Sequence, residues 1–223
     1  MALSLESRGV PFACPSPQSL HGKSLFQLSY RLRVFDLILT ELGDPAGRRY
    51  VDLGAGPLMF AQRARNYGFD VTAVDARPPW TGADPEGVKH VLADIREFPL
   101  DGFDVIGIVG LLYHLRLDEQ IDLLRRCEGR PTIIDTEVWC PDLVKSLGLE
   151  SPRVRSVDSE SGYSGAMLQE TGNLWSSYGN PESFWLDEPS LLRLASACGW
   201  QTAITMEPPY FSQFGRRRWY LLK

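Results

Sequence analysis

The residues with the clearest chemical potential form a short loop, Asp52-Leu53-Gly54-Ala55-Gly56. The loop ends the β-rich run 49–53 and precedes residues 59–67, whose apolar spacing is helical. Glycines let a ligand approach the main chain, and the start of a helix offers free N–H groups. Asp75 ends the next β-rich run, where its carboxylate can accept hydrogen bonds from both hydroxyls of a ribose. The pattern therefore predicts a site for a ligand that contains a nucleoside.

Two side chains indicate which nucleoside ligand suits this loop. The phosphate-binding fingerprint G-x-G-x-x-G would need its third glycine at Met59, whose side chain obstructs the approach of a pyrophosphate. Asp52 would repel a pyrophosphate, but it suits the ammonium group of a methionine-derived ligand. S-adenosylmethionine is therefore favoured as the cofactor, and an NAD-dependent oxidoreductase is the disfavoured alternative.

The elements around the loop alternate between strand and helix patterns. Apolar residues at three- and four-residue spacing between Ser19 and Leu42 indicate an N-terminal amphipathic helix. A short hairpin joins the last two expected strands, so the final strand should run antiparallel. The alternation predicts a doubly wound α/β fold with a mostly parallel sheet. Beyond the loop unit, strands are expected at 89–93, 103–109, 132–138, 201–206 and 217–222, and helices at 118–127 and 189–198.

Length and composition indicate one soluble domain. The chain has 223 residues and a formal net charge of -5, which disfavours phosphate-rich partners and makes nucleic acid an unfavoured, though not excluded, partner. Residues 1–17 are expected to be a flexible arm, and residues 18–223 a single domain. Four scattered cysteines and the lack of a long apolar stretch favour a cytoplasmic protein that does not enter a membrane. A homodimer is left open.

Several motifs resemble those of class I S-adenosylmethionine-dependent methyltransferases, a Rossmann-like family. They are VDLGAGP, VTAVDAR, LADIREFPL and DVIGIVGLLYHL, and the likeness covers about residues 48–140. The resemblance implies a seven-stranded sheet with an antiparallel last strand. It also implies that Gly54 and Gly56 contact the methionine part, Asp75 holds the ribose, and Asp94 and the Ile95 main chain meet the adenine. The predicted cofactor site is completed by Ala55, Ala76 and Gly110, with Asp52 as above.

Two finer points belong to this resemblance. Leu58 stands where the family often has a third glycine, which implies an unusual shape for the methionine pocket. A weaker likeness to the wobble-uridine carboxymethyltransferase branch rests on GLLYHL and on residues 180–200. Neither the tRNA substrate nor the carboxylated cofactor of that branch is carried over to this chain.

The acceptor site is expected at the carboxyl ends of the fourth and fifth strands, where ligands gather in open α/β sheets. His114 is the candidate general base, since an unperturbed imidazole titrates near neutrality. Asp135 and Glu137 lie two residues apart on one strand, so both should point to one side of the sheet and could orient an acceptor. Two carboxylates are too few ligands to predict a metal. We predict His114 and Glu137 as catalytic and Tyr113, Asp135, Trp175, Tyr178 and Trp185 as substrate-binding.

The irregular segment 141–188, inserted after the fifth strand, is rich in aromatic residues and is predicted to act as a substrate lid. The leading functional hypothesis is a methyltransferase that acts on a hydroxyl oxygen of a small molecule. One alternative is an RNA (tRNA) methyltransferase, motivated by Tyr113-His114 and the basic run 216–218. The other is a non-catalytic binding module with the same fold.

Overall fold

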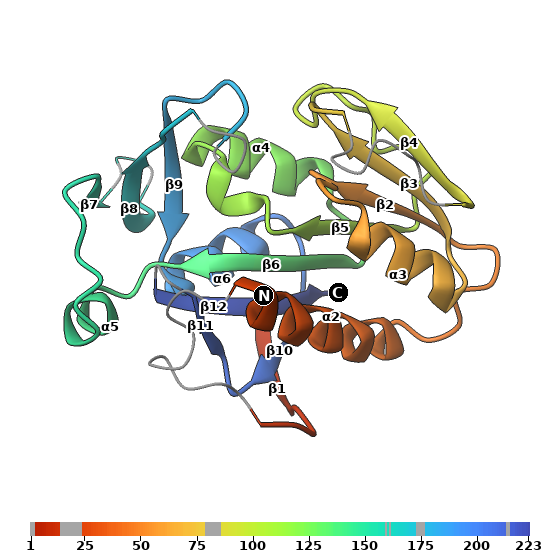
Figure 1. Cartoon of the computed structure of the whole chain (residues 1–223), viewed down its shortest axis with the longest axis horizontal. Helices are drawn as coiled ribbons and strands as arrows, with labels where there is room; N and C mark the ends of the chain where they lie inside the picture. The colour runs from red at the N-terminus through yellow and green to blue at the C-terminus, as the bar shows by residue number, and fades with distance from the viewer. Residues whose placement is uncertain are drawn as a thin grey trace.

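A central twisted sheet organises the protein, whose computed structural model describes residues 3–13, 24–78, 86–158, 160, 162–172, 177–212 and 215–223. Within these residues nine strands join in the order β1-β10-β12-β6-β5-β2-β3-β4, and β11 pairs with β12 (Figure 1). The strands are β1 Ser4–Gly9, β2 Arg49–Leu53, β3 Asp70–Asp75, β4 Val88–Leu92, β5 Val105–Val109, β6 Thr132–Val138, β10 Thr202–Glu207, β11 Tyr210–Ser212 and β12 Gly215–Leu222.

The sheet confirms the fold predicted from the alternating pattern. β2, β3, β4, β5 and β6 are mutually parallel, and β12 runs antiparallel between β6 and β10. Because neighbouring strands are parallel, the loops that follow β2, β3 and β5 leave the sheet at one edge. That edge holds the glycine loop, Asp75 and His114, so the topology brings the predicted site residues together.

Helices cover both faces of the sheet. Helices α2 (Ser24–Glu41) and α3 (Met59–Tyr67) share one apolar core with Tyr50 and Trp219. Helices α4 (Leu117–Arg126) and α6 (Glu188–Ala197) share a second core on the opposite face with Val51 and Tyr220. The alternation of neighbouring residues between the two cores follows from the period of two along a strand. No helix among the described residues is long and apolar enough to cross a membrane.

The N-terminal arm differs from the expectation of a flexible segment. Ser4–Gly9 forms β1, which lies parallel to β10 with Ser4 opposite Thr202. The N–H of Ser4 donates to the carbonyl of Gln201 over 2.8 Å, and the N–H of Val10 donates to the carbonyl of Glu207 over 2.8 Å. The open edge of β10 thus supplies hydrogen bonds that the prolines and polar residues of the arm do not suggest. Residues 14–17 lie outside the described residues.

The insertion between β6 and α6 contains more regular structure than its sequence suggests. A short helix, α5 (Pro141–Ser146), is followed by the antiparallel strands β7 (Val154–Asp158), β8 (Ser164–Gln169) and β9 (Glu182–Leu186). A bridge between Trp139 and Asp187 closes the base of the insertion. Figure 1 shows α5, β7 and β8 beyond the carboxyl end of β6, on the side of the sheet edge that carries the glycine loop.

Candidate cofactor and acceptor site

The glycine loop is held against the neighbouring strand by its own main chain. The N–H groups of Gly54 and Ala55 both donate to the carbonyl of Val74, over 2.8 and 3.1 Å. Gly54 has a φ of 68°, and a Cβ atom there would lie 2.8 Å from Cδ1 of Leu111. Position 54 therefore requires glycine for its left-handed backbone and for the space that Leu111 occupies. The same contact brings the loop after β5 directly onto the loop after β2.

Leu58, which stands where the resembled family often has a glycine, lies at the start of α3. This residue caps the helix with a φ of 62°, a left-handed conformation that costs a non-glycine residue about 1–2 kcal/mol. Its side chain is fully buried in the core shared with α2. Burial of a leucine side chain contributes about 1.5–3 kcal/mol, enough to offset the backbone cost. Leucine thus keeps the turn that glycine often provides, because its side chain packs.

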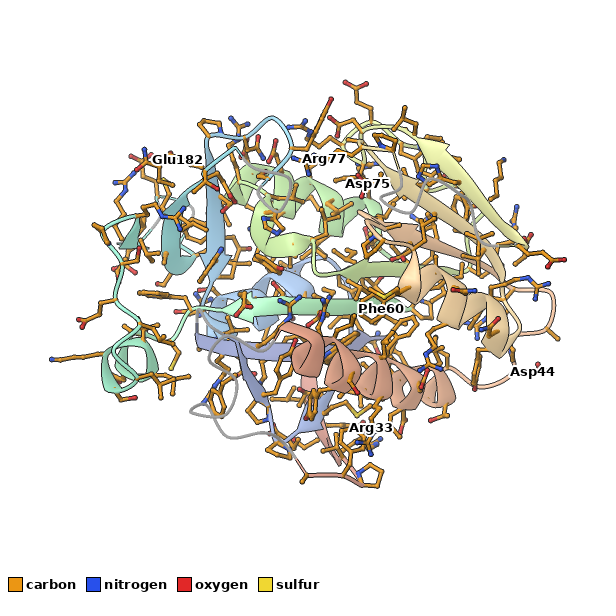
Figure 2. The ribbon with its side chains drawn as sticks, in the orientation of Figure 1. Arg33, Asp44, Phe60, Asp75, Arg77 and Glu182 are labelled. Carbon is orange, nitrogen blue, oxygen red and sulfur yellow. The ribbon has the colours of Figure 1, made fainter. Side chains whose placement is uncertain are left out.

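Asp75 joins the end of β3 to the glycine loop. Its Oδ2 accepts a hydrogen bond from the Gly56 N–H over 2.9 Å, and its Oδ1 accepts one from the Arg77 N–H over 2.8 Å. Figure 2 shows Asp75 and Arg77 near one another at the carboxyl end of β3. A carboxylate in this position can accept further hydrogen bonds, since two oxygens offer about four lone-pair sites. The predicted ribose acid is therefore oriented by the loop that the cofactor would contact.

Asp52 is the most unusual ionisable group of the loop. Its side chain is 1% exposed, and its Oδ2 has no hydrogen-bond partner among the described residues. Burial, together with the negative charge of Asp75, raises the pKa of Asp52 to about 7, although the Ala61 N–H and the charge of Arg31 oppose this rise. A buried carboxylate oxygen without a partner is costly. The position is suited to a ligand that brings a positive charge.

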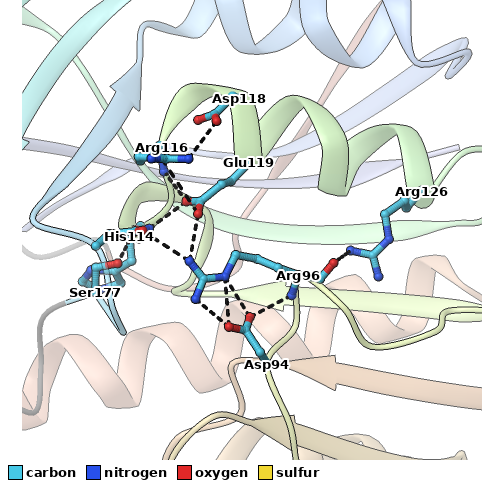
Figure 3. A network of polar contacts seen from close by, with 9 residues as sticks. Asp94, Arg96, His114, Arg116, Asp118, Glu119, Arg126 and Ser177 are labelled. Atoms are coloured by element: carbon cyan, nitrogen blue, oxygen red, sulfur yellow. Dashed lines mark hydrogen bonds and ion pairs between the residues drawn. The ribbon is translucent and has the colours of Figure 1, made fainter.

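The side of the site predicted to meet adenine contains a polar network (Figure 3). Arg96 donates from Nε to both carboxylate oxygens of Asp94, over 2.9 and 3.0 Å, and from Nη2 to Oδ2 over 2.5 Å. These hydrogen bonds lower the pKa of Asp94. Arg96 Nη1 also donates to Oε1 of Glu119 over 2.9 Å and to Oδ1 of Asn180 over 3.3 Å. An adenine amino group would therefore have to share the Asp94 carboxylate with Arg96.

The acidic pair on β6 lies inside an ion-pair cluster. Arg217 donates from Nε and Nη2 to the two oxygens of Asp135, both over 2.8 Å, and from Nη1 to Oε1 of Glu137 over 3.1 Å. Arg31, from α2, also reaches Asp135, with Nε 2.7 Å from Oδ2. Burial would raise the pKa of Asp135, but the charges of Arg217 and Arg31 outweigh burial and hold it below its ordinary value.

This cluster modifies two expectations from the sequence. Asp135 and Glu137 do point to one side of the sheet, because Arg217 contacts both. Their carboxylates are paired with arginines, however, so they supply the negative charges of the cluster and are not free to face an acceptor. Within the basic run that motivated the RNA alternative, Arg217 and Arg218 are buried, at 6% and 7% exposed. Arg218 pairs with Glu188 and Glu207 over 2.8 and 2.5 Å.

His114 and Tyr113 lie in a single 3-10 turn, η1 (Leu112–His114), directly after β5. The two rings are 4.3 Å apart between centroids, and Tyr113 meets the edge of Trp185 at 6.2 Å. The hydroxyl of Tyr113 accepts a hydrogen bond from Nη1 of Arg217 over 3.2 Å. His114 Nδ1 lies 3.4 Å from Oε1 of Glu170. Tyr113, His114 and Trp185 therefore form one group beside the arginine cluster.

The other two residues predicted to bind substrate are placed differently. Tyr178 is half exposed, and the guanidinium carbon of Arg77 lies 5.4 Å from its ring centroid. Trp175 lies outside the described residues. Tyr178 thus lies near the end of β3, on the predicted cofactor side.

Comparison with known proteins finds no matching family model and no matching curated sequence. Solved structures do match. The N-terminal domain of EvdMO1, crystallised in the presence of S-adenosylhomocysteine and D-fucose, has a TM-score of 0.61 at 19% identity, over 86% of this chain and 81% of that one. The 1,6-didemethyltoxoflavin-N1-methyltransferase of Burkholderia thailandensis, with bound 1,6-didemethyltoxoflavin and S-adenosylhomocysteine, has a TM-score of 0.57 at 19% identity, over 96% of this chain and 92% of that one. The magnesium protoporphyrin IX methyltransferase of Synechocystis has a TM-score of 0.59 at 14% identity, over 88% and 87%.

The chain has the S-adenosylmethionine-dependent methyltransferase fold. At these identities the likeness establishes the architecture. Within the methyltransferase fold, the glycine loop, Asp75 and the turn after β5 occupy the sheet edge described above.

The insertion after β6 contains a cavity of about 230 Å³. It is bounded by α5, β7, β8 and β9, and its apolar walls include both Trp139 and Trp185. Glu150 and Arg153 contribute charged groups to its lining. Trp185 contacts Tyr113 on another side, so the cavity wall and the turn after β5 are in contact.

Three residues of the site were missed by the sequence analysis. Arg31 and Arg217 form the cluster on β6, and Glu170 contacts His114. For Arg217 a signal was present, because Arg217, Trp219 and Leu221 alternate on one side of β12. A strand with this alternation predicts that Arg217 points into the core face. Neither Arg31 nor Glu170 belongs to a recognisable motif.

Proposed function

We propose that the protein is an S-adenosylmethionine-dependent methyltransferase that acts on a small molecule. The single observation that supports this most directly is Asp52, a buried carboxyl with one oxygen lacking a partner among the described residues. It lies beside a glycine loop that is tied to Asp75. A pyrophosphate would be repelled at this position, whereas the ammonium group of a methionine-derived cofactor would neutralise the carboxylate.

The residues present fit such a cofactor. Asp52 would meet the ammonium group, Gly54 and Gly56 would allow the methionine part to approach the main chain, and Asp75 would accept hydrogen bonds from the ribose. Asp94 and the main chain of Ile95 would face the adenine. The bound cofactor supplies an electrophilic methyl carbon on a sulfonium. The work left to the protein is mainly to align the acceptor, which lowers the barrier by several kcal/mol.

We further propose a hydroxyl oxygen as the methyl acceptor. His114 is partly exposed beside Tyr113 and can accept the hydroxyl proton, an effect worth about 10²–10⁴-fold in rate. The ion-pair cluster of Arg31, Arg217, Asp135 and Glu137 provides a fixed polar wall. The cavity between Trp139 and Trp185 has room for an apolar part of the acceptor, which supports an acceptor with a ring.

The insertion supports the role of a lid. Ser177 donates from its hydroxyl to the carbonyl of His114 over 2.5 Å, and Asn180 donates to Oε2 of Glu119 over 2.7 Å. Figure 3 shows Ser177 beside His114, with the Asp94–Arg96 pair in the same network. Residues 177–180 therefore connect the proposed acceptor side to the proposed adenine side.

Two of the similar structures support a small-molecule acceptor, because the names of these methyltransferases contain 1,6-didemethyltoxoflavin and magnesium protoporphyrin IX. The tRNA alternative loses one of its reasons, because Arg217 and Arg218 are buried in ion pairs and do not offer a basic surface.

Calorimetric titration and thermal unfolding with S-adenosylmethionine, S-adenosylhomocysteine and NADH test the proposal. Both adenosyl ligands should bind and raise the melting temperature, and NADH should not. Absence of binding by both adenosyl ligands would contradict the proposal. Binding without methyl transfer to any member of a panel of phenols, alcohols and amines would favour the binding-module alternative.

A further inference from the structure

Glu170 contacts His114 from the insertion, although the two residues are 56 positions apart. Glu170 directly follows β8, and its N–H donates to the carbonyl of Pro181 over 2.9 Å, which fixes its main chain. Its side chain is only 5% exposed, and Oε1 lies 3.4 Å from Nδ1 of His114. A carboxylate this deeply buried needs partners that stabilise its charge.

The surroundings of Glu170 do stabilise its charged form. Burial raises the pKa of Glu170, but hydrogen bonding, chiefly to His114, outweighs burial and holds the pKa below its ordinary value. The main-chain N–H of Ser177 acts in the same direction. Glu170 is therefore a carboxylate at neutral pH and can only accept hydrogen bonds.

The main chain of His114 is equally well fixed. Its N–H donates to the carbonyl of Leu111 over 2.8 Å, and its carbonyl accepts the hydroxyl hydrogen of Ser177. The ring of Tyr113 lies against the imidazole. What these contacts leave open is the tautomer, because a neutral imidazole carries its single N–H on either Nδ1 or Nε2. Facing an acceptor-only carboxylate, Nδ1 is the nitrogen that keeps the hydrogen.

We infer that Glu170 is a positioning residue that fixes the N–H of His114 on Nδ1 and leaves Nε2 free to accept a proton. The inference rests on the proposed function, in which His114 takes the proton of an acceptor hydroxyl. That proton moves to Nε2 and produces an imidazolium, whose positive charge Glu170 stabilises across the Nδ1 contact. No other group has to change protonation state in this step. The insertion then contributes to the reaction centre itself, in addition to covering it.

The tautomer can be measured without knowledge of the acceptor. Nitrogen NMR of protein labelled at histidine, recorded at about pH 8.5, well above the usual imidazole range, reports which ring nitrogen carries hydrogen. The chain has three histidines, so the signals of His114 must be assigned. The His114→Asn variant assigns them without any change at Glu170, because it removes one set of signals. Wild-type His114 should carry its N–H on Nδ1. An N–H on Nε2 in the wild type would overturn the inference without any need for a Glu170 variant.

The decisive variant is Glu170→Met, which keeps the length of the side chain and removes its acceptor oxygens. We expect loss of the Nδ1–H signal and appearance of Nε2–H, whereas a purely structural Glu170 would lower the melting temperature and leave the tautomer unchanged. Glu170→Asp should retain Nδ1–H. Glu182→Met is the matched control, because Glu182 belongs to the same small sheet and is half exposed (Figure 2).

Calorimetry with S-adenosylhomocysteine on the same samples separates this inference from the proposed function. Glu170→Met should bind it within about twofold of the wild type, since separate sites act nearly additively. If the wild type does not bind S-adenosylhomocysteine, the proposed function fails whatever the tautomer. If it binds and the tautomer is the same with and without Glu170, only the role of Glu170 fails.

Discussion

Two buried aspartates show how differently the two halves of the site are built. Asp52, on the cofactor side, keeps one oxygen without a partner in the described chain, and its pKa is raised. Asp135, on the acceptor side, is held by two arginines, and its pKa is lowered. Both are almost fully buried. On the proposed cofactor side, a positively charged ligand would favour the ionised form of Asp52, whereas on the proposed acceptor side the arginines of the protein already keep Asp135 ionised.

The halves also differ in the distance along the chain over which they are assembled. Gly56 and Asp75 are 19 positions apart. Arg31 and Asp135 are 104 apart, and Arg217 and Asp135 are 82 apart. The glycine loop and Asp75 therefore come from one contiguous segment, while the ion-pair cluster around Asp135 exists only once β12 has paired with β6.

The largest effect on stability should come from breaking the ion pairs of Arg217 with Asp135 and Glu137. In Arg217→Met, Glu137 loses its arginine and Asp135 keeps only Arg31, so we expect a loss of about 3–5 kcal/mol in the free energy of unfolding. Urea denaturation followed by circular dichroism measures it. Arg216→Met, which alters a longer and more exposed pair with Glu188, should cost less than about 1 kcal/mol. Equal losses in both variants would contradict the contrast.

The cofactor half should respond to pH in the opposite way from an ordinary carboxyl. Folded Asp52 holds its proton up to about pH 7, while an unfolded aspartate releases it near 3.8, so the folded state binds more protons in this window. Its contribution to the free energy of unfolding must fall as pH rises from about 4 to about 7, by at most about 4 kcal/mol. Asp52→Asn should lack this slope and bind S-adenosylmethionine more weakly. If the free energy of unfolding depends on pH in the same way in both proteins, the pKa of Asp52 is not raised by folding.

A smaller effect on the same side is expected from substitution of Asp75, the predicted ribose acid. Asp75→Asn keeps the shape of the side chain but loses the charge and one acceptor. We expect the Kd for S-adenosylhomocysteine to rise about 100-fold, equivalent to about 2.7 kcal/mol. Asp70→Asn, at the exposed start of the same strand, is the control and should leave the Kd unchanged. A Kd for Asp75→Asn within threefold of the control would remove Asp75 from the site, since about 1.4 kcal/mol corresponds to tenfold.

The smallest effect is expected where the insertion meets the cofactor side. Tyr178→Ala removes a half-exposed ring from beside Arg77 and should cost about 0.5–1 kcal/mol in binding S-adenosylhomocysteine, a factor of about two to five. Tyr163→Ala, at a ring elsewhere in the insertion, provides the comparison. If the two variants bind S-adenosylhomocysteine equally well, the ring of Tyr178 does not contribute to cofactor binding.

What the sequence could predict follows the same division. The strand, loop and acid from Arg49 to Asp75 were predicted correctly as structure, because the period of the apolar residues and the glycines act within one segment. β1 was missed because its side chains are largely exposed and its hydrogen bonds come from the distant β10. β7 and β8 were missed because polar residues and glycines weaken their alternation. The burial of Arg217 was not predicted, because three successive arginines suggest a basic surface until the register of β12 is known.

The pairing of β1 with β10 also affects how the chain is made. Ser4 is opposite Thr202, so 198 positions separate the two strands in the order of synthesis. At roughly 5–20 residues per second, a ribosome would need on the order of 10–40 s between them. During that interval β1 has no edge to join, and its charged residues Glu6 and Arg8 keep it compatible with water. The first described strand to leave the ribosome must therefore wait for β10 before it can join the sheet.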